Sequence, residues 1–336
     1  MTPFNCQSVK NILIISTTGM GDCLWGTPGV RALKKSFPNA GIDLLIRPEW
    51  EGIYFGNPHI RTVISYSPQW YHQLALLPRL MGMRYDQVLI FHANKDIRRL
   101  LPRLRYARIL AHQNLPGLLD EQILKFSQTT HPILRRMALL EKTGVESDGV
   151  QMDIFLNDKD NAEVISFLEQ NQMKSKEFVY LNVGASLPHK RWPSDRMTSL
   201  AKLILENTSL GIILGGGPED AQTIEEIENQ INKERVTHAH HRSLRANCAL
   251  IDQARLMITT DTGPMHIAFA TKVPTIALFG PTRPSDSGPC QIDPQLCQAL
   301  QSTAMDTLDH APTDQSNFFD SITVEMVWEK VNQLLA

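Results

Sequence analysis

Two side chains in separate loops have the type and the setting to do chemistry. Asp22 lies in the glycine-rich loop TTGMGDCLWG, which follows the apolar run NILIIS. Lys190 lies in the loop GASLPHKRWP, which follows another apolar run, FVYLNV. A positioned carboxylate can take a proton from an incoming hydroxyl, and a lysine can neutralise a phosphate leaving group. The two residues together are typical of group transfer from a phosphorylated donor, although a lone loop aspartate is also a common turn or helix-cap residue.

A third segment, residues 259–281, has the features of an anion site. It reads TTDTGPMHIAFATKVPTIALFGP, with Thr262 or Gly263 as the cap of a helix that starts at a proline. The first amide groups of such a helix have no partners within the helix and favour a negative group. Asp261 stands just before this start and His266 just after it. Taken singly, Asp261 could be only a cap and His266 only a half-buried structural histidine.

The elements around the first loop form a β-α-β pattern. Residues 11–16 and 42–46 are buried apolar runs that predict parallel strands. One face of the helix between them is marked by Val30, Leu33 and Phe37. Further strands are expected at residues 61–65, 86–91 and 106–110. Because open α/β sheets bind ligands at the carboxyl ends of their strands, the glycine-rich loop lies at the expected binding edge.

A second run of the same kind fills the rest of the chain. Strands are expected at residues 178–183, 210–214, 255–259 and 273–279. One of the intervening helices shows its buried face at Met197, Leu200, Ala201 and Ile204. The polar stretch NDKDN, at residues 157–161, is the best linker candidate. The sequence therefore predicts an α/β protein with two doubly wound halves, 1–157 and 158–322, and a cleft between them.

The overall composition is that of a globular enzyme. The 336 residues are 42% hydrophobic and 20% charged. No run reaches the roughly 18 consecutive apolar residues of a membrane helix, and the start lacks the pattern of a secretion signal, so we expect a cytoplasmic protein. The five cysteines are odd in number and form no C-x-x-C pair, which favours reduced thiols and no metal site.

The charge is unevenly distributed along the chain. The net charge is −2, but residues 1–150 hold 18 Lys and Arg against 11 Asp and Glu, and the remainder holds 15 against 24. The densest basic stretch is KDIRRLLPRLRYAR, residues 95–108, with Arg98, Arg99 and Arg103 as candidates to bind a partner. This balance indicates an anionic acceptor or an anionic membrane surface for the first half. The alternative is an ordinary solvated helix face.

Several common motifs are missing from the sequence. It holds no G-x-x-x-x-G-K-[ST] and no HExxH or G-x-S-x-G, so phosphate-loop nucleotidases, zinc proteases and serine hydrolases lose support. No G-x-G-x-x-G occurs with an acidic residue about 20 positions further on, which disfavours a dinucleotide dehydrogenase. We also expect no nucleic acid as a partner.

Four motifs, in this order, resemble glycosyltransferase family 9, the heptosyltransferases of lipopolysaccharide core assembly. They are ILIISTTGMGDCLWGTPGVRALKKSFPNAGIDLLI, LNVGASLPHKRWPSDRMTSLAKLI, ILGGGPED and DTGPMHIAFATKVPTIALFGPT. The resemblance extends over essentially the whole chain and implies a GT-B fold of two Rossmann-like domains facing across a cleft. It places the acceptor on residues 1–157 and the nucleotide sugar on residues 158–322. The last segment, 323–336, is expected to form a helix that packs back on the N-terminal domain.

The resemblance also implies the reaction. It is an inverting, metal-independent transfer from ADP-heptose to an anionic, lipid-linked inner-core saccharide, without a cofactor, with peripheral contact at the cytoplasmic face of the inner membrane as an option. Asp22 takes the place of the catalytic base and Lys190 that of the phosphate-binding lysine, while Thr18 and Gly19 adjoin the acceptor. The remaining donor-binding positions are Ser186, Glu219, Asp261, Thr262, Gly263 and His266.

The chain departs from the family near its C-terminus. Many relatives carry paired cysteines there, whereas this chain has Phe318 and Phe319, and Cys290 and Cys297 lack partners. The segment 286–315 has no pattern that predicts a structure. Other readings stay open at this point: a family member with another nucleotide sugar or acceptor, a non-catalytic sugar-nucleotide-binding protein, or a GT-B epimerase.

Overall fold

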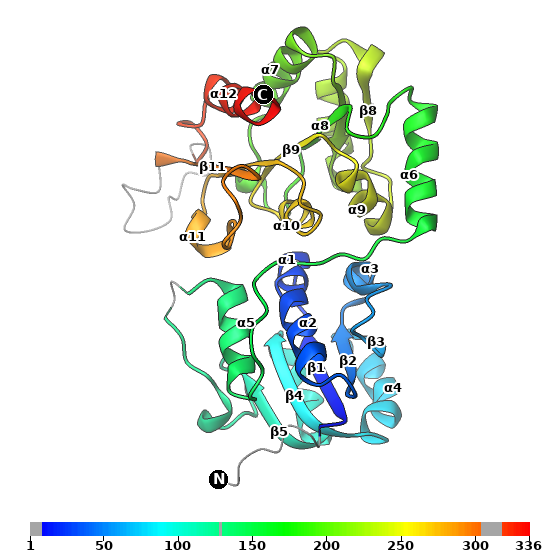
Figure 1. The fold of residues 1–336 in the computed structure, drawn as a ribbon, viewed down its shortest axis with the longest axis vertical. Helices are drawn as coiled ribbons and strands as arrows, with labels where there is room; N and C mark the ends of the chain where they lie inside the picture. The colour runs from blue at the N-terminus through cyan, green and yellow to red at the C-terminus, as the bar shows by residue number, and fades with distance from the viewer. Residues whose placement is uncertain (1–8, 128–129, 304–317) are drawn as a thin grey trace. The chain divides into compact units, whose positions relative to one another are not determined.

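The chain folds into two compact units, Met1–Phe155 and Leu156–Ala336 (Figure 1). The computed structural model describes residues 9–127, 130–303 and 318–336. Each unit is a parallel β-sheet covered by helices, as the alternation of apolar runs and amphipathic segments predicts. The predicted α/β class with two Rossmann-like units is confirmed.

Unit 1 is built on a five-stranded sheet in the order β3-β2-β1-β4-β5, with all pairs parallel. Its strands are β1 (Asn11–Ser16), β2 (Gly41–Ile46), β3 (Thr62–Ser65), β4 (Arg84–His92) and β5 (Arg105–Ala111). The predicted strands are confirmed, with ends that shift by one to a few residues. Central strand β1 is buried along almost its whole length, which is why its sequence is a continuous apolar run instead of an alternating one.

Helices cover both faces of this sheet. Helices α2 (Thr27–Ser36) and α5 (Pro132–Glu141) pack together on one face. The other face holds α4 (Trp70–Met81) and two 3-10 turns, η3 (Lys95–Arg99) and η4 (Leu101–Arg103). There Leu13 and Ile15 of β1 join Leu80 of α4 and Ile97 of η3 in one buried cluster. Short helices at the strand ends are α1 (Met20–Leu24), η2 (Pro48–Trp50), α3 (Glu51–Tyr54) and η5 (Asp120–Gln122).

Unit 2 is built on a six-stranded parallel sheet in the order β11-β10-β9-β6-β7-β8. Its strands are β6 (Phe178–Asn182), β7 (Gly211–Gly215), β8 (Val236–His238), β9 (Leu256–Thr260), β10 (Thr275–Phe279) and β11 (Cys297–Gln301). Its longer helices are α6 (Asp158–Gln170), α7 (Ser194–Asn207), α8 (Ala221–Glu228), α9 (Leu244–Asp252), α10 (Gly263–Ala270) and α12 (Val324–Leu335). The predicted inner face of α7 is confirmed, since its four marked residues are buried.

Each sheet has one place where the strand order reverses. In unit 1 the chain moves outward from β1 to β3 and then returns to the other side of β1 with β4. In unit 2 the same reversal separates β6 from β9. Loops that leave two such strands turn away from each other, so a crevice opens at their carboxyl ends. These two points are where ligand-binding loops are expected.

One sequence-based expectation about the boundaries is wrong. The expected linker at residues 157–161 instead starts α6, because the Asn157 side chain accepts from the Asp160 amide and Asp160 returns a contact to the Asn157 amide. The last helix, α12, belongs to unit 2, and its predicted contact with the N-terminal unit stays a prediction. Its buried residues Val327 and Val331 join the core of unit 2, where α12 packs on α7.

Other parts of the C-terminal region gain a structure that the sequence did not predict. Within the segment 286–315, β11 pairs in parallel with β10, and residues 304–315 lie outside the described part. Phe318 and Phe319 are buried in the core of unit 2. Cys23, Cys248, Cys290 and Cys297 are free thiols. Among the described residues no helix is long and apolar enough to cross a membrane.

Candidate functional site

The Asp22 carboxylate lies at the point where the strand order of unit 1 reverses. It sits in the first turn of α1, directly after the loop that leaves β1, where the helix dipole favours a negative group. Thr18 Oγ donates to its Oδ2 at 2.8 Å, and Arg136 Nη2 donates to its Oδ1 at 3.0 Å. The side chain remains 19% exposed. A substrate hydroxyl can therefore reach a carboxylate whose orientation is already fixed.

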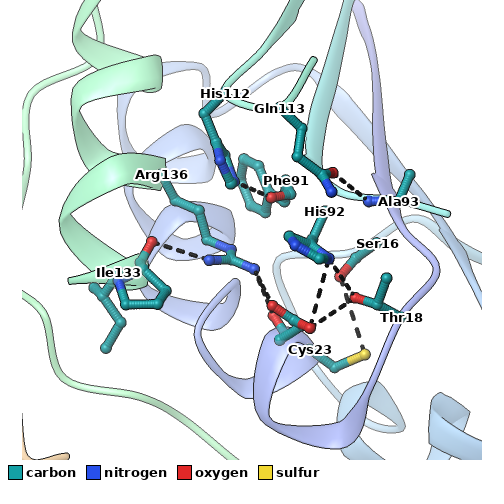
Figure 2. Close-up of polar contacts among 12 residues, drawn as sticks. Ser16, Thr18, Cys23, Phe91, His92, Ala93, His112, Gln113, Ile133 and Arg136 are labelled. Atoms are coloured by element: carbon teal, nitrogen blue, oxygen red, sulfur yellow. Dashed lines mark hydrogen bonds and ion pairs between the residues drawn. The ribbon is translucent and has the colours of Figure 1, made fainter. Parts of the chain in front are cut away.

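Arg136 reaches this site from α5, 114 positions further along the chain. Its side chain is fully buried, and Nη1 donates to the Pro132 carbonyl at 2.9 Å while the guanidinium lies 5.7 Å from the Trp25 ring centroid. Figure 2 shows Arg136, Thr18 and His92 converging from the helix, the loop and the strand. Removing one partner of a buried ion pair typically lowers the stability of a protein by about 3–5 kcal/mol. Loss of Asp22 would therefore leave the buried Arg136 without its charged partner.

His92, at the end of β4, is the second neighbour of the carboxylate. Its Nδ1 lies 2.9 Å from Thr18 Oγ and 3.6 Å from Asp22 Oδ2. The single hydroxyl proton of Thr18 is given to Asp22, so a neutral His92 must donate its Nδ1 proton to the Thr18 oxygen. That hydrogen-bond pattern assigns the tautomer with a bare Nε2. The chain of contacts thus runs from His92 through Thr18 to Asp22.

The charges of these groups follow from their surroundings. Burial raises the pKa of Asp22, but Arg136, His92 and the Thr18 hydroxyl outweigh it, and the pKa falls below its ordinary value of 3.8. Asp22 is therefore ionised at neutral pH. The stability from this ionisation is complete above about pH 3.8 and is lost as the pH falls through the lower folded value. Burial lowers the pKa of His92 below 6.5, helped by Arg136 and opposed by Asp22.

Neighbouring side chains hold the loop that carries Asp22. Trp50 Nε1 donates to the Thr18 carbonyl at 2.8 Å, and the buried Tyr54 hydroxyl donates to the Cys23 carbonyl at 2.6 Å. A Cβ at Gly26 would stand 2.8 Å from that tyrosine oxygen, so only glycine fits there. A Cβ at Gly19 would meet no atom within 4 Å. The loop is packed on its inner side and open next to Thr18, the side expected to adjoin the acceptor.

The second site lies where the strand order of unit 2 reverses, between β6 and β9. Lys190 Nζ lies 3.3 Å from Asp261 Oδ2, joining the loop after β6 to the loop after β9. Asn182 lies at the end of β6, and its side-chain amide donates to the hydroxyls of Thr259 and Thr262 at 3.2 and 3.3 Å. Thr262 is the N-cap of α10 but makes no side-chain cap bond. The first backbone amides of α10 therefore receive no hydrogen-bond acceptor from the Thr262 side chain. Lys190 lies beside this end of the helix through its contact with Asp261.

The Lys190 loop has its own internal support. Arg191 Nη2 pairs with the buried Asp220 at 2.8 Å and also donates to the Ala185 carbonyl. Asp220 Oδ2 in turn accepts from the Gly217 amide at 2.8 Å. A Cβ at Gly184 would stand 2.1 Å from that carboxylate oxygen. This close approach requires a glycine at position 184, and the Arg191–Asp220 ion pair ties the GGGPED turn to the lysine loop.

The structure brings together only part of the predicted donor site. Lys190, Asp261, Thr262 and Gly263 lie at the strand-order reversal of unit 2, and His266 is buried on α10 with its ring edge-on to Phe269. Ser186 and Glu219 are exposed on neighbouring loops. Their roles stay predictions.

The basic segment does not take part in the Asp22 cluster. The contacts described for Arg99 and Arg103 lead to the Pro68 carbonyl and the Arg99 carbonyl, and Arg98 is exposed. Their proposed role toward an acceptor stays a prediction.

Sequence reasoning missed Arg136 and His92. Arg136 lies three residues after Ile133 and four before Leu140, so it stands on the apolar face of a helix. A lone arginine in that position was the available signal, because a buried charge needs a partner. His92 directly follows the apolar part of β4 and so lies at the carboxyl edge of the sheet. That placement alone could have added it to the site.

The two parallel α/β units form a GT-B fold, which the chain shares with solved heptosyltransferase structures. The sequence profile of glycosyltransferase family 9 (heptosyltransferase) matches residues 110–311. The chain therefore belongs to glycosyltransferase family 9, and it is a glycosyltransferase.

Similar proteins agree with this assignment. Lipooligosaccharide heptosyltransferase 2 of Haemophilus influenzae is 26% identical, covering 97% of this chain and 99% of its own. Lipopolysaccharide heptosyltransferase 3 of Escherichia coli is 28% identical over 78% of this chain and 80% of its own. The structure described as E. coli ADP-heptose lipopolysaccharide heptosyltransferase II has a TM-score of 0.80 at 20% identity, covering 97% and 98% of the two chains.

Solution NMR of imidazole nitrogens tests the His92–Thr18–Asp22 chain of contacts. At pH 7 we expect His92 to be neutral with its proton on Nδ1, and to titrate below pH 6.5 because of burial. Asp22→Asn should lower the pKa of His92 further, since the carboxylate raises it. Asp43→Asn, which alters a buried aspartate paired with Arg61 elsewhere in unit 1, is the control and should leave the titration unchanged. A proton on Nε2 or a pKa above 6.5 would contradict the assignment.

Proposed function

We propose that this glycosyltransferase moves heptose from ADP-heptose to an anionic, lipid-linked saccharide of the lipopolysaccharide inner core, with inversion at the anomeric carbon and without a metal. The observation that carries the proposal is the Asp22 carboxylate, held ionised and oriented by Arg136 and Thr18 at the edge of unit 1. Support for the sugar and acceptor comes from the names of the relatives, which are lipooligosaccharide and lipopolysaccharide heptosyltransferases. The donor is suggested by the ADP-heptose enzyme that shares the fold.

Asp22 acts as the general base in this proposal. The acceptor hydroxyl attacks the anomeric carbon, the bond from that carbon to the diphosphate oxygen breaks, and the hydroxyl proton passes to the Asp22 carboxylate. The lowered pKa makes Asp22 a weak base, which suits a late proton transfer, because the hydroxyl becomes acidic as its oxygen bonds to carbon. Arg136 and Thr18 act as positioning residues. Each bonds one oxygen of the carboxylate, and together they fix its orientation.

Unit 2 binds the donor in this proposal. Lys190 contributes a positive charge to the departing diphosphate, and the amides at the start of α10, near Thr262 and Gly263, add partial positive charge. Asp261 pairs with the lysine, and a phosphate would compete for the same ammonium. Ser186 is assigned to a phosphate oxygen, Glu219 to the ribose and His266 to the sugar side of the site.

The acceptor meets unit 1 at the loop that carries Asp22. Thr18 and Gly19 are assigned to it because the space next to Gly19 is open and Thr18 already bonds the base. The acceptor is lipid-linked, so we place the reaction at the cytoplasmic face of the inner membrane, with no nucleic acid and no cofactor involved.

Acceptor-dependent release of ADP tests the function as a whole. Purified protein is incubated with a panel of nucleotide sugars, with and without core-lipid acceptors, and free nucleotide is measured. We expect release only with ADP-heptose and an acceptor together. Epimerisation or hydrolysis of the donor without acceptor, or binding without any turnover, would overturn the proposal in favour of an epimerase or a binding protein. Turnover with another nucleotide sugar would mean that the donor is not ADP-heptose.

Removing the base should slow the chemical step. Asp22→Asn keeps an oxygen that can accept from Arg136 but cannot hold the proton, so we expect kcat to fall about 10²–10⁴-fold with ADP affinity unchanged. Asp43→Asn is the matched control, since Asp43 is also a buried aspartate paired with an arginine, Arg61, in the same unit. The control should lose stability but keep kcat. Near wild-type turnover of Asp22→Asn would remove this residue from the base role.

Removing the lysine charge should weaken both the donor complex and its transition state. For Lys190→Ala we expect kcat/KM to fall about 10²–10³-fold and ADP to bind more weakly, because the ammonium contacts the diphosphate in both states. Lys190→Arg should recover part of the loss. Lys202→Ala, an exposed lysine on α7, is the control and should change neither quantity. Unchanged ADP affinity in Lys190→Ala would mean that this lysine does not face the phosphates.

A further inference from the structure

Helix α4 of unit 1 exposes apolar side chains where a surface helix normally exposes polar ones. Trp70 is 64% exposed, Tyr71 53%, Leu74 48% and Met81 46%. The opposite side of α4 packs on the protein, since Gln73 and Leu80 are buried. A helix that is apolar on two sides usually has a second apolar environment to meet. An exposed patch of this kind marks an interaction site.

A basic rim lies directly beside this patch. Arg99 of η3 and Arg103 of η4 line one groove together with Trp70, Leu74 and Leu77 of α4. Arg99 Nη1 donates to the Pro68 carbonyl at 3.3 Å and Arg103 Nη1 to the Arg99 carbonyl at 2.6 Å. A guanidinium has five N–H donors, so most of the donors on each arginine remain available. The groove therefore combines aromatic, aliphatic and cationic groups.

No carboxylate neutralises this rim within the described part of the chain. Asp96, the acidic residue of η3, accepts a hydrogen bond from the Tyr66 hydroxyl. Among described residues, Arg98, Arg99 and Arg103 form no ion pair. Residues 95–103 hold Lys95, Arg98, Arg99 and Arg103 against the single carboxylate of Asp96, so the local charge is net positive and the complementary partner is anionic.

We propose that α4 and the η3–η4 turns form a membrane-docking face for a bilayer surface with anionic headgroups. Trp and Tyr side chains concentrate at the depth of the headgroups, and arginines next to them pair with lipid phosphates. A soluble anionic saccharide would satisfy the arginines but would leave Trp70, Leu74 and Met81 in water. The apolar and the cationic groups are both satisfied only by a partner that is apolar inside and anionic outside.

This face is distinct from the Asp22 site in its contacts. Arg136 comes from α5, which packs with α2 on the other face of the sheet. The docking proposal therefore does not need the acceptor to touch Arg98, Arg99 or Arg103, and it is independent of the sugar that is transferred.

Vesicle sedimentation with no donor and no acceptor present tests the proposal. The probes are phosphatidylcholine vesicles with and without phosphatidylglycerol, at low and high salt. We expect the full chain to sediment with the anionic vesicles only, and less at high salt. The double variant Arg99→Gln, Arg103→Gln should bind about 30-fold more weakly, since each basic residue near an anionic surface is worth about 1 kcal/mol. Trp70→Ser with Leu74→Ser should weaken binding on the order of tenfold.

The matched control is Lys35→Gln with Lys142→Gln, which removes the same charge from α2 and from the end of α5 on the other face of unit 1. It should bind as the unaltered chain does. All substituted residues lie at the surface, and equal thermal unfolding midpoints check that the variants fold. Equal loss in the control and in the arginine variant would mean a general charge effect and overturn the proposal. Failure of the full chain to sediment with the phosphatidylglycerol vesicles at low salt, where no acceptor is present, would overturn it too.

Discussion

The buried ion pair between Arg136 and Asp22 is the constraint on which unit 1 depends. A fully buried guanidinium is costly unless a charge and several acceptors surround it, and here Asp22, the Pro132 carbonyl and the Trp25 ring supply them. The pair ties α5 to the loop after β1, so it fixes the helix and the site together. It also keeps the carboxylate ionised despite its burial. In the proposed reaction this carboxylate is a weak proton acceptor whose orientation is fixed before the substrate binds.

Both units place their polar side chains at the same point in the topology of a parallel sheet. Asp22 follows β1 and His92 ends β4 in unit 1, while Lys190 follows β6 and Asp261 follows β9 in unit 2. In both sheets these neighbouring strands are the ones at which the order reverses, where loops separate and polar groups can converge. The strands therefore fix where each loop begins, and so they position the polar side chains that the loops carry.

The sequence predicted those features that depend on local patterns. The strands on both sides of the two loops were predictable because they are continuous apolar runs, and Asp22 and Lys190 were predictable from their places after them. Arg136 was not, because its burial depends on a partner 114 positions away. The start of α6 was read as a linker because Asn157 and Asp160 are polar, although their reciprocal contacts cap a helix. Strand β8 has only three residues, and β11 (CQALQ) is half polar, so neither forms a continuous apolar run in the sequence.

The stereochemistry of transfer tests the central claim most directly. A single base at Asp22 and a diphosphate that leaves from the opposite side of the sugar require one displacement at the anomeric carbon, which inverts its configuration. The measurement is the one-bond carbon–hydrogen coupling at the anomeric centre of the product, made from a donor of known configuration. The account predicts the configuration opposite to that of the donor. A retained configuration would require a covalent or front-side route and would contradict it.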